Sequence, residues 1–179
     1  MALRELLAGR ENSDFDGMLG AIRQHLGMDV AFISEFRDGM RIFRHVDQAD
    51  PPSPVAVGGS DPLDDSYCLR VADGRFPQVI PEVAAMAATT AVPVGAHLSV
   101  PIVFSTGEIF GTLCCFSRQP DATLTERDAA MMSVFAEVIA GRLEAENVER
   151  HLEDERLQRL SPYLQGSGLT TAFQPIVHL

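Results

Sequence analysis

The sequence predicts an α+β domain with a central antiparallel sheet, helices on both sides of that sheet and a long C-terminal helix. Two observations carry this prediction. Strand-like runs come in two hairpin pairs separated by short helical segments, and a proline-free helical pattern follows the second pair. The chain has 179 residues, 46% of them hydrophobic, which is enough for the core of one domain.

An amphipathic helix comes first. Its apolar residues recur at helical spacing, with Ser13 or Asp14 available as a cap and Gly27 just beyond the end; they are Phe15, Met18, Leu19, Ile22 and Leu26. Two β-branched and aromatic runs follow, residues 28–36 and 40–46. Asp38-Gly39 between these runs is typical of a β-hairpin.

The middle of the chain is predicted to be a loop with short elements. Residues 50–65 hold four prolines and an adjacent glycine pair, with Val55 to Val57 as a short extended piece. A helix is expected over Ser66–Asp73, ended by Gly74, and then a short strand over Phe76–Ile80. Pro81 suits the start of a helix over Glu82–Met86, and residues 89–95 return to loop.

A second hairpin is predicted from His97–Phe104 and Glu108–Ser117. Pro101 places its strand at a sheet edge or beside a bulge, because proline cannot donate to the strand ladder. In the other strand, Cys114 and Cys115 should point to opposite faces of the sheet. Structural packing is therefore the favoured role for this pair.

A long helix is expected from the capping box Thr125-Glu-Arg-Asp128 onward. One apolar stripe keeps heptad spacing, with Gly141 at an intervening position; it comprises Met131, Val134, Val138, Ala145, Val148 and Leu152. The part beyond Arg142 is highly charged and needs a second chain to cover its stripe. We therefore expect a parallel homodimer through this helix.

Charge and composition limit the partners. The formal net charge is −11, which disfavours nucleic acid, and no apolar stretch is long enough for a membrane span. The cysteines Cys68, Cys114 and Cys115 are an odd number, so a disulfide framework is not expected and a reducing cytoplasm fits.

Several strings resemble the GAF family of small-molecule sensor domains over about Phe15 to Leu143. They are Asp65-Ser-Tyr-Cys-Leu-Arg-Val-Ala-Asp-Gly74, Gly95-Ala-His-Leu-Ser-Val-Pro-Ile-Val103 and Gly107-Glu-Ile-Phe-Gly-Thr-Leu-Cys-Cys-Phe116. The resemblance implies a ligand pocket between one face of the sheet and the short helices. The candidate ligand-binding residues are Tyr67, Cys68, Arg70, Glu82, His97 and Ser99.

The last residues resemble the opening strand of an EAL domain, the family that hydrolyses cyclic di-GMP. The matching string is Phe173-Gln-Pro-Ile-Val177, and the catalytic carboxylates of that family would lie further along. We therefore expect a piece of a longer signalling protein without phosphodiesterase activity of its own. The expected divisions are an extension over residues 1–12, a sensor domain over 13–143, a signalling helix and linker over 144–168, and an incomplete EAL-type domain over 169–179.

The chemistry of the sensor domain has three interpretations: ligand-gated regulation, a cysteine-based enzyme similar to the GAF proteins that reduce free methionine sulfoxide, or a ligand-free dimerisation spacer filled by its own phenylalanines. Some GAF domains attach a bilin through a cysteine that His follows, whereas Leu69 follows Cys68, which disfavours a bilin. The ligand itself is not identified by any string. The spacing of the histidines and cysteines predicts no metal site.

Overall fold

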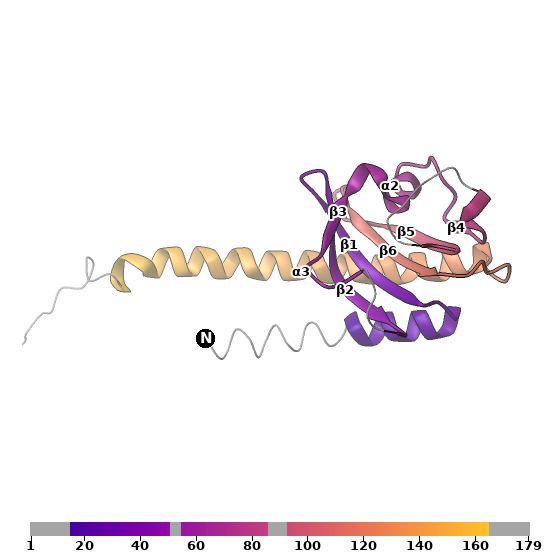
Figure 1. Cartoon of the computed structure of the whole chain (residues 1–179). Coiled ribbons are helices and arrows are strands. Elements are labelled where there is room, and N and C mark those ends of the chain that lie inside the picture. The colour runs from indigo at the N-terminus through magenta and orange to yellow at the C-terminus, as the bar shows by residue number, and fades with distance from the viewer. Residues whose placement is uncertain (1–14, 51–54, 86–92, 165–179) are drawn as a thin grey trace, which may run out of the picture. The chain divides into compact units, whose positions relative to one another are not determined.

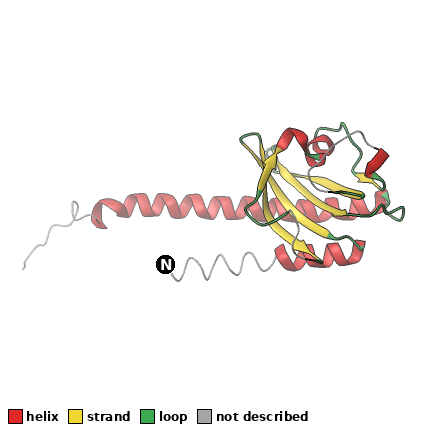
Figure 2. Cartoon of the chain, in the orientation of Figure 1, coloured by secondary structure: helices red, strands yellow, loops and turns green. Residues whose placement is uncertain are grey.

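The computed structural model describes residues 15–50, 55–85 and 93–164 (Figure 1). Its strands form one six-stranded antiparallel sheet in the order β3-β2-β1-β6-β5-β4. Helices flank both faces of this sheet, as Figure 2 shows. The predicted α+β class, with its antiparallel sheet and long C-terminal helix, is confirmed.

The first hairpin joins β1 (Val30–Arg37) to β2 (Met40–Gln48). Its turn needs two residues with positive φ, and Asp38 and Gly39 supply φ values of 53° and 73°. The register shifts between Ile33 and Ser34, where Arg44 of β2 has no opposite residue in β1, so Phe43 and Val46 of β2 pack in the same apolar cluster although they are three residues apart.

The second hairpin joins β5 (Ala96–Val103) to β6 (Ile109–Ser117), and β6 is central because it also pairs with β1. The neighbour on the other side of β5 is β4 (Val79–Ile80), which pairs only with His97 and Leu98. Among the described residues, Pro101 therefore lies beyond the part of β5 that pairs with β4, and a register shift follows Ile102. The strand β5 lies inside the sheet rather than at its edge, so it is the expected bulge that the structure places next to Pro101.

The middle segment differs in detail from the sequence prediction. The strand in this loop is β3 (Ser60–Pro62), which pairs with the start of β2, rather than an extended piece at residues 55–57. The 3-10 turn η1 (Leu63–Asp65) leads into α2 (Tyr67–Ala72), which Ser66 caps through its side chain. A second 3-10 turn, η2 (Val83–Ala85), replaces the helix expected to start after Pro81.

The face of the sheet opposite α2 carries the main apolar core. The helix over residues 15–26 contributes Phe15, Leu19 and Ile22 to it, and the first part of α3 (Glu126–Leu164) contributes Met132 and Ile139, all of them almost fully buried. Burial of side chains of this size is the main stabilising contribution in such a domain. The sheet is thereby fixed between two layers of helix.

The helix α3 extends over 39 residues and begins at the predicted capping box, where the Asp128 carboxylate accepts hydrogen bonds from the Thr125 backbone N–H and hydroxyl, both 2.8 Å long. The chain divides into two compact units, residues 1–141 and 142–179, with the boundary inside this helix. Five residues of the heptad stripe are exposed: Val134, Val138, Ala145, Val148 and Leu152. Within the described residues, we find no helix with both the length and the apolarity that a bilayer span requires.

Candidate functional site

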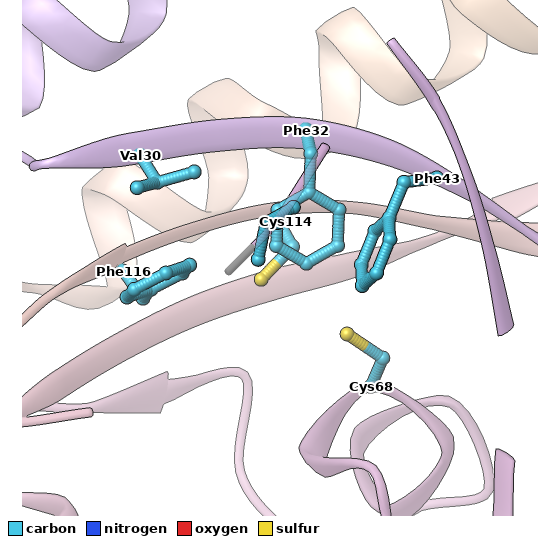
Figure 3. Packing of buried hydrophobic residues seen from close by; sticks show 7 residues of the cluster. Val30, Phe32, Phe43, Cys68, Cys114 and Phe116 are labelled. Atoms are coloured by element: carbon cyan, nitrogen blue, oxygen red, sulfur yellow. The ribbon is translucent and has the colours of Figure 1, made fainter. Parts of the chain in front are cut away.

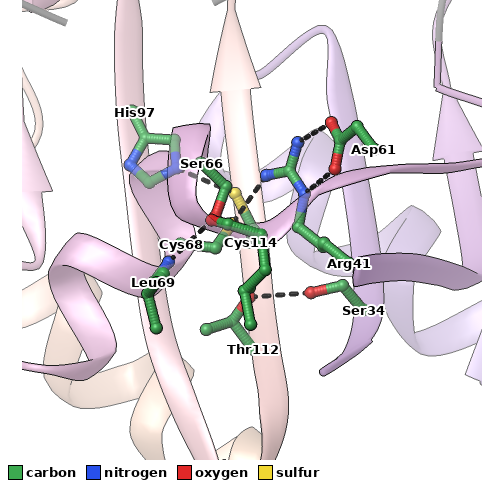
Figure 4. A network of polar contacts seen from close by, with 10 residues as sticks. Ser34, Arg41, Asp61, Ser66, Cys68, Leu69, His97, Thr112 and Cys114 are labelled. Carbon is green, nitrogen blue, oxygen red and sulfur yellow. Dashed lines mark hydrogen bonds and ion pairs between the residues drawn. The ribbon is translucent and has the colours of Figure 1, made fainter. Parts of the chain in front are cut away.

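A group of polar side chains lies between α2 and the sheet, and all of its members except the partly exposed Asp61 are buried (Figure 4). We call it the α2 cluster and define it as Arg41 of β2, Asp61 of β3, Cys68 of α2, His97 of β5 and Cys114 of β6. Four of the six strands thus contribute one side chain each. The Ser66 hydroxyl accepts a hydrogen bond of 3.1 Å from the Leu69 N–H. This cap starts α2 just before Cys68.

The contacts inside the cluster are short. Arg41 Nη1 donates to Cys68 Sγ at 3.0 Å, and Arg41 Nε donates to Asp61 Oδ1 at 2.9 Å. A further bond from Arg41 Nη2 to the second Asp61 oxygen makes this pair bidentate. On the other side, His97 Nε2 lies 3.2 Å from Cys114 Sγ. The ligating atoms of Cys68, His97 and Cys114 all lie within 4.8 Å of one another.

The two thiols of the cluster are electrostatically unequal. A hydrogen bond from Cys114, together with the charge of Arg41 and the contact with His97, holds the pKa of Cys68 well below its ordinary value, although burial opposes this. Burial and the neighbouring Cys68 raise the pKa of Cys114 well above its ordinary value. Of the two thiols, Cys68 therefore ionises more readily than Cys114.

Two polar atoms beside the cluster lack partners among the described residues. They are His97 Nδ1 and the hydroxyl of Ser99, and both side chains are buried. Ser99 faces Cys114 directly in the β5–β6 register, so its side chain is on the same sheet face as the cluster. An unsatisfied buried polar group costs about 1–3 kcal/mol, and a ligand that bonds it would remove that cost.

An apolar wall borders the cluster (Figure 3). Phe32 and Phe43 meet edge to face with ring centroids 5.1 Å apart, and the Arg41 guanidinium lies over both rings at 5.6 and 5.0 Å. Val30, Cys68 and Cys114 belong to the same buried cluster of side chains. In this low-dielectric setting, charge interactions among the polar groups are stronger than in water.

The six ligand-binding residues predicted from the sequence occupy different places. Cys68 and His97 belong to the α2 cluster, Ser99 lies beside it, and the Tyr67 ring centroid lies 5.4 Å from that of His97. Arg70 instead lies over the ring of Phe76, and Glu82 is exposed. These last two therefore do not join the buried polar group.

Cys114 and Cys115 do face opposite sides of the sheet, as their adjacency predicts. Cys114 points toward α2, whereas Cys115 is near the ion pair of Arg23 with Asp47, and burial raises its pKa to about 12. Cys115 is therefore a protonated packing residue under physiological conditions.

Sequence reasoning missed Arg41, Asp61 and the pairing of Cys68 with Cys114. Residue numbers gave no indication of this, because 46 positions separate the two cysteines and 27 separate Arg41 from Cys68. A usable signal did exist for Arg41: alternation along β2 places this charged residue on the same sheet face as Phe43, two residues away.

Comparisons with known proteins place this fold. The crystal structure of the GAF domain from the Acinetobacter phosphoenolpyruvate-protein phosphotransferase matches with a TM-score of 0.64 and 16% identity, covering 78% of this chain and 86% of that one. Free methionine-R-sulfoxide reductase from Neisseria meningitidis, in complex with its substrate, matches at 0.63 and 17%, covering 78% and 81%. The blue-light-absorbing form of the PixJ GAF domain from Thermosynechococcus elongatus matches at 0.63 and 20%, covering 90% and 97%.

No curated protein sequence matches the chain. The three structural matches show the fold alone at these identities. A family model, however, matches residues 14–143, which include the whole sheet, α2 and the first part of α3. This chain therefore belongs to the GAF domain family.

Proposed function

We propose that this GAF domain is the small-molecule-sensing regulatory module of a bacterial signal-transduction protein, acting in the cytoplasm. The observation that carries the proposal is the pair of unpartnered polar atoms, His97 Nδ1 and Ser99 Oγ, at a buried cluster that already contains Arg41 and Cys68. A bound ligand that accepts from one group and donates to the other would stabilise the domain in one conformation. Tyr67 lies over His97, and α2 is therefore the element whose position such a ligand would change.

The proposed output is an EAL cyclic di-GMP phosphodiesterase domain. Its support is the string Phe173-Gln-Pro-Ile-Val177, which lies outside the described residues and resembles the start of that family. The same helix, α3, carries Met132 and Ile139 of the sensor core and continues toward that string. A change in packing under α2 would reach the output through this helix, which is the two-state element that regulation requires.

A parallel homodimer through α3 is part of the same proposal. Val134, Val138, Val148 and Leu152 are each about half exposed or more, with values of 61, 54, 60 and 48%, and they keep heptad spacing. Valine and leucine at such positions gain about 0.8 kcal/mol per buried CH₂ when a second helix covers them. A second copy of this chain presents the same stripe, as a two-fold axis requires.

Native mass spectrometry of the purified chain, compared with its denatured mass, tests the sensory role. A dimer with additional mass that Ser99→Ala removes and Ser133→Ala retains would support ligand sensing. Ser133 is a suitable control because its hydroxyl already bonds the Ala129 carbonyl at 2.9 Å on α3. A bare dimer that also ignores a library of small metabolites would contradict sensing and leave the dimerisation spacer.

A second candidate function is reduction of a sulfoxide, and a specific observation favours it. Cys68 and Cys114 are buried together next to Arg41, the pKa of Cys68 is lowered there, and one of the structural matches is a free methionine-R-sulfoxide reductase. Two thiols and a sulfoxide would give a Cys68–Cys114 disulfide, the thioether and water, which balances two electrons and two protons. Substrate access is the obstacle, since both cysteines have no exposed surface in this conformation.

An assay with free methionine sulfoxide and a dithiol reductant separates the two functions. Turnover that Cys68→Ala and Cys114→Ala abolish and Cys115→Ala preserves would establish the reductase. Equal background rates for the wild type and all three variants would exclude it and leave the sensor.

A further inference from the structure

The Cys68, His97 and Cys114 side chains present two sulfurs and one imidazole nitrogen to a common point. They come from α2, β5 and β6, and their ligating atoms lie within 4.8 Å of one another. We propose that these three residues bind a thiophilic divalent cation of the Zn²⁺ type. Sulfur and imidazole donors in a set of three or four are the ligands that zinc selects.

The distances suit such an ion with little rearrangement. Zn–S bonds of about 2.3 Å and Zn–N bonds of about 2.0–2.1 Å in a tetrahedron separate two sulfurs by about 3.8 Å and a sulfur from a nitrogen by about 3.6 Å. His97 Nε2 and Cys114 Sγ are 3.2 Å apart. They need to open by only a few tenths of an ångström, while Cys68 stays within the range already observed.

The charges balance once the ion is bound. Two thiolates would neutralise a divalent cation, and Arg41 is already balanced by its bidentate contact with Asp61. Two buried thiolates without a cation would repel each other, and an ion between the two sulfurs would remove that repulsion. Cysteine binds a metal as the thiolate, so binding would release protons.

The surroundings supply the other parts of a metal site. Arg41 Nη1 donates to Cys68 Sγ at 3.0 Å, a contact of the kind that orients a ligating thiolate from outside the coordination sphere. Ser99, buried and without a partner among the described residues, faces Cys114 across the β5–β6 pair and would hold a water or hydroxyl in the fourth position. The three donor residues are only 0–3% exposed, so an ion bound there would stabilise the fold or act as the sensed ligand rather than take part in catalysis.

Metal binding would deepen the proposed sensory role. The metal site stands without that role, and only the effect of binding on signalling rests on it. Cobalt titration of the full chain tests it directly. The chain is freed of metal with a chelator, kept reduced with a phosphine, and titrated with Co²⁺, whose thiolate complexes absorb by charge transfer. The expected result is a charge-transfer band that saturates at one Co²⁺ per chain and disappears when Zn²⁺ is added.

Two alanine variants test the cysteine ligands, and a third is their matched control. Cys115→Ala, on the opposite sheet face, should keep the band and the affinity. Cys68→Ala and Cys114→Ala should each bind more than about 100-fold more weakly, because loss of an outer contact alone costs about 10- to 100-fold. His97→Gln should weaken binding as well, and circular dichroism establishes that each variant is folded.

Every result decides the proposal. If Cys68→Ala and Cys114→Ala do not fold, the Cys115→Ala chain decides alone, because any thiolate band in it must come from Cys68 or Cys114. A wild type without a charge-transfer band, or a band that Cys115→Ala removes, would overturn the metal site. Failure there leaves the sensory role intact if native mass spectrometry still finds an organic ligand, so the two failures are distinguishable.

Discussion

The Arg41 guanidinium donates a hydrogen bond to Cys68 Sγ over 3.0 Å, joining β2 to α2 across 27 residues of chain. The same guanidinium donates hydrogen bonds from Nε and Nη2 to the two carboxylate oxygens of Asp61 in β3. Burial alone would lower the pKa of Arg41, but Cys68 and Asp61 together raise it, so the group is permanently charged. One side chain therefore fixes a helix, an edge strand and the ionisation of a thiol.

Replacing Arg41 tests this triple role. Arg41→Met should lower the free energy of unfolding by about 2–3 kcal/mol. The nearly buried Arg41 is lost from its ion pair, and Asp61, which is 37% exposed, recovers only part of its hydration. Arg37→Met is the control: Arg37 pairs with Glu35 but its side chain is 55% exposed, so the loss should be at most about 1 kcal/mol. Urea unfolding measures both, and equal losses would contradict the role assigned to Arg41.

Gly111 in β6 should tolerate no side chain. A Cβ there would lie 1.9 Å from the Ser34 carbonyl oxygen, and backbone in the centre of a sheet cannot withdraw. Gly111→Ala is expected to lower stability by about 3 kcal/mol or more, beyond the usual range for overpacking. Gly17→Ala, in the first helix with open space around it, should raise stability by about 1 kcal/mol. Thermal unfolding measures both variants, and a higher unfolding midpoint for Gly111→Ala than for Gly17→Ala would contradict the prediction.

The hydroxyls of Ser34 and Thr112 form a hydrogen bond of 3.0 Å between β1 and β6, and both are fully buried. Thr112→Val should cost about 1–3 kcal/mol, since it leaves the Ser34 hydroxyl without a partner. Adding Ser34→Ala should then recover most of that loss. A double-mutant cycle in chemical unfolding gives the coupling free energy. Strict additivity of the two substitutions would mean that the bond contributes nothing.

His45 predicts a pH dependence of stability. Burial lowers its pKa below the ordinary 6.5, with Arg44 adding to this and Asp16 opposing it. Below about pH 6.5 the unfolded chain therefore binds more protons than the folded one. The free energy of unfolding consequently decreases as the pH is lowered, by at most about 1.4 kcal/mol per pH unit from this residue. The advantage of the wild type over His45→Gln in urea unfolding should be constant above pH 7 and shrink toward pH 5. An advantage that grows in acid would contradict the assignment.

The stripe on α3 predicts an oligomeric effect. Val148→Lys should shift the chain from dimer toward monomer in sedimentation equilibrium, since it places a charge at the centre of the proposed helix pair. Asn147→Lys, the adjacent exposed position outside the stripe, should leave the dimer unchanged. Equal dissociation by the two variants would point to charge alone, and a monomeric wild type would remove the dimer from the proposal.

The sequence by itself determined the secondary elements, because their signals are local. The Asp38-Gly39 turn, the Ser66 cap, the stop at Gly74 and the Thr125–Asp128 box each act within a few residues of chain, and all four occur in the structure. Alternation along β6 likewise placed Cys114 and Cys115 on opposite faces. The short strand β3 escaped prediction because its three residues pair with β2 for reasons of register, not composition.

Tertiary structure alone decided the site. Cys68, His97 and Cys114 carry no mutual spacing that periodicity can detect, and they meet only because β5 pairs with β6 and α2 packs against both strands. The same fold brings Cys114 and Arg41 against Cys68, and both lower the pKa of this thiol. Charge and hydrogen bonding depend on distances of a few ångströms, and such distances are set by sheet order rather than by position along the chain.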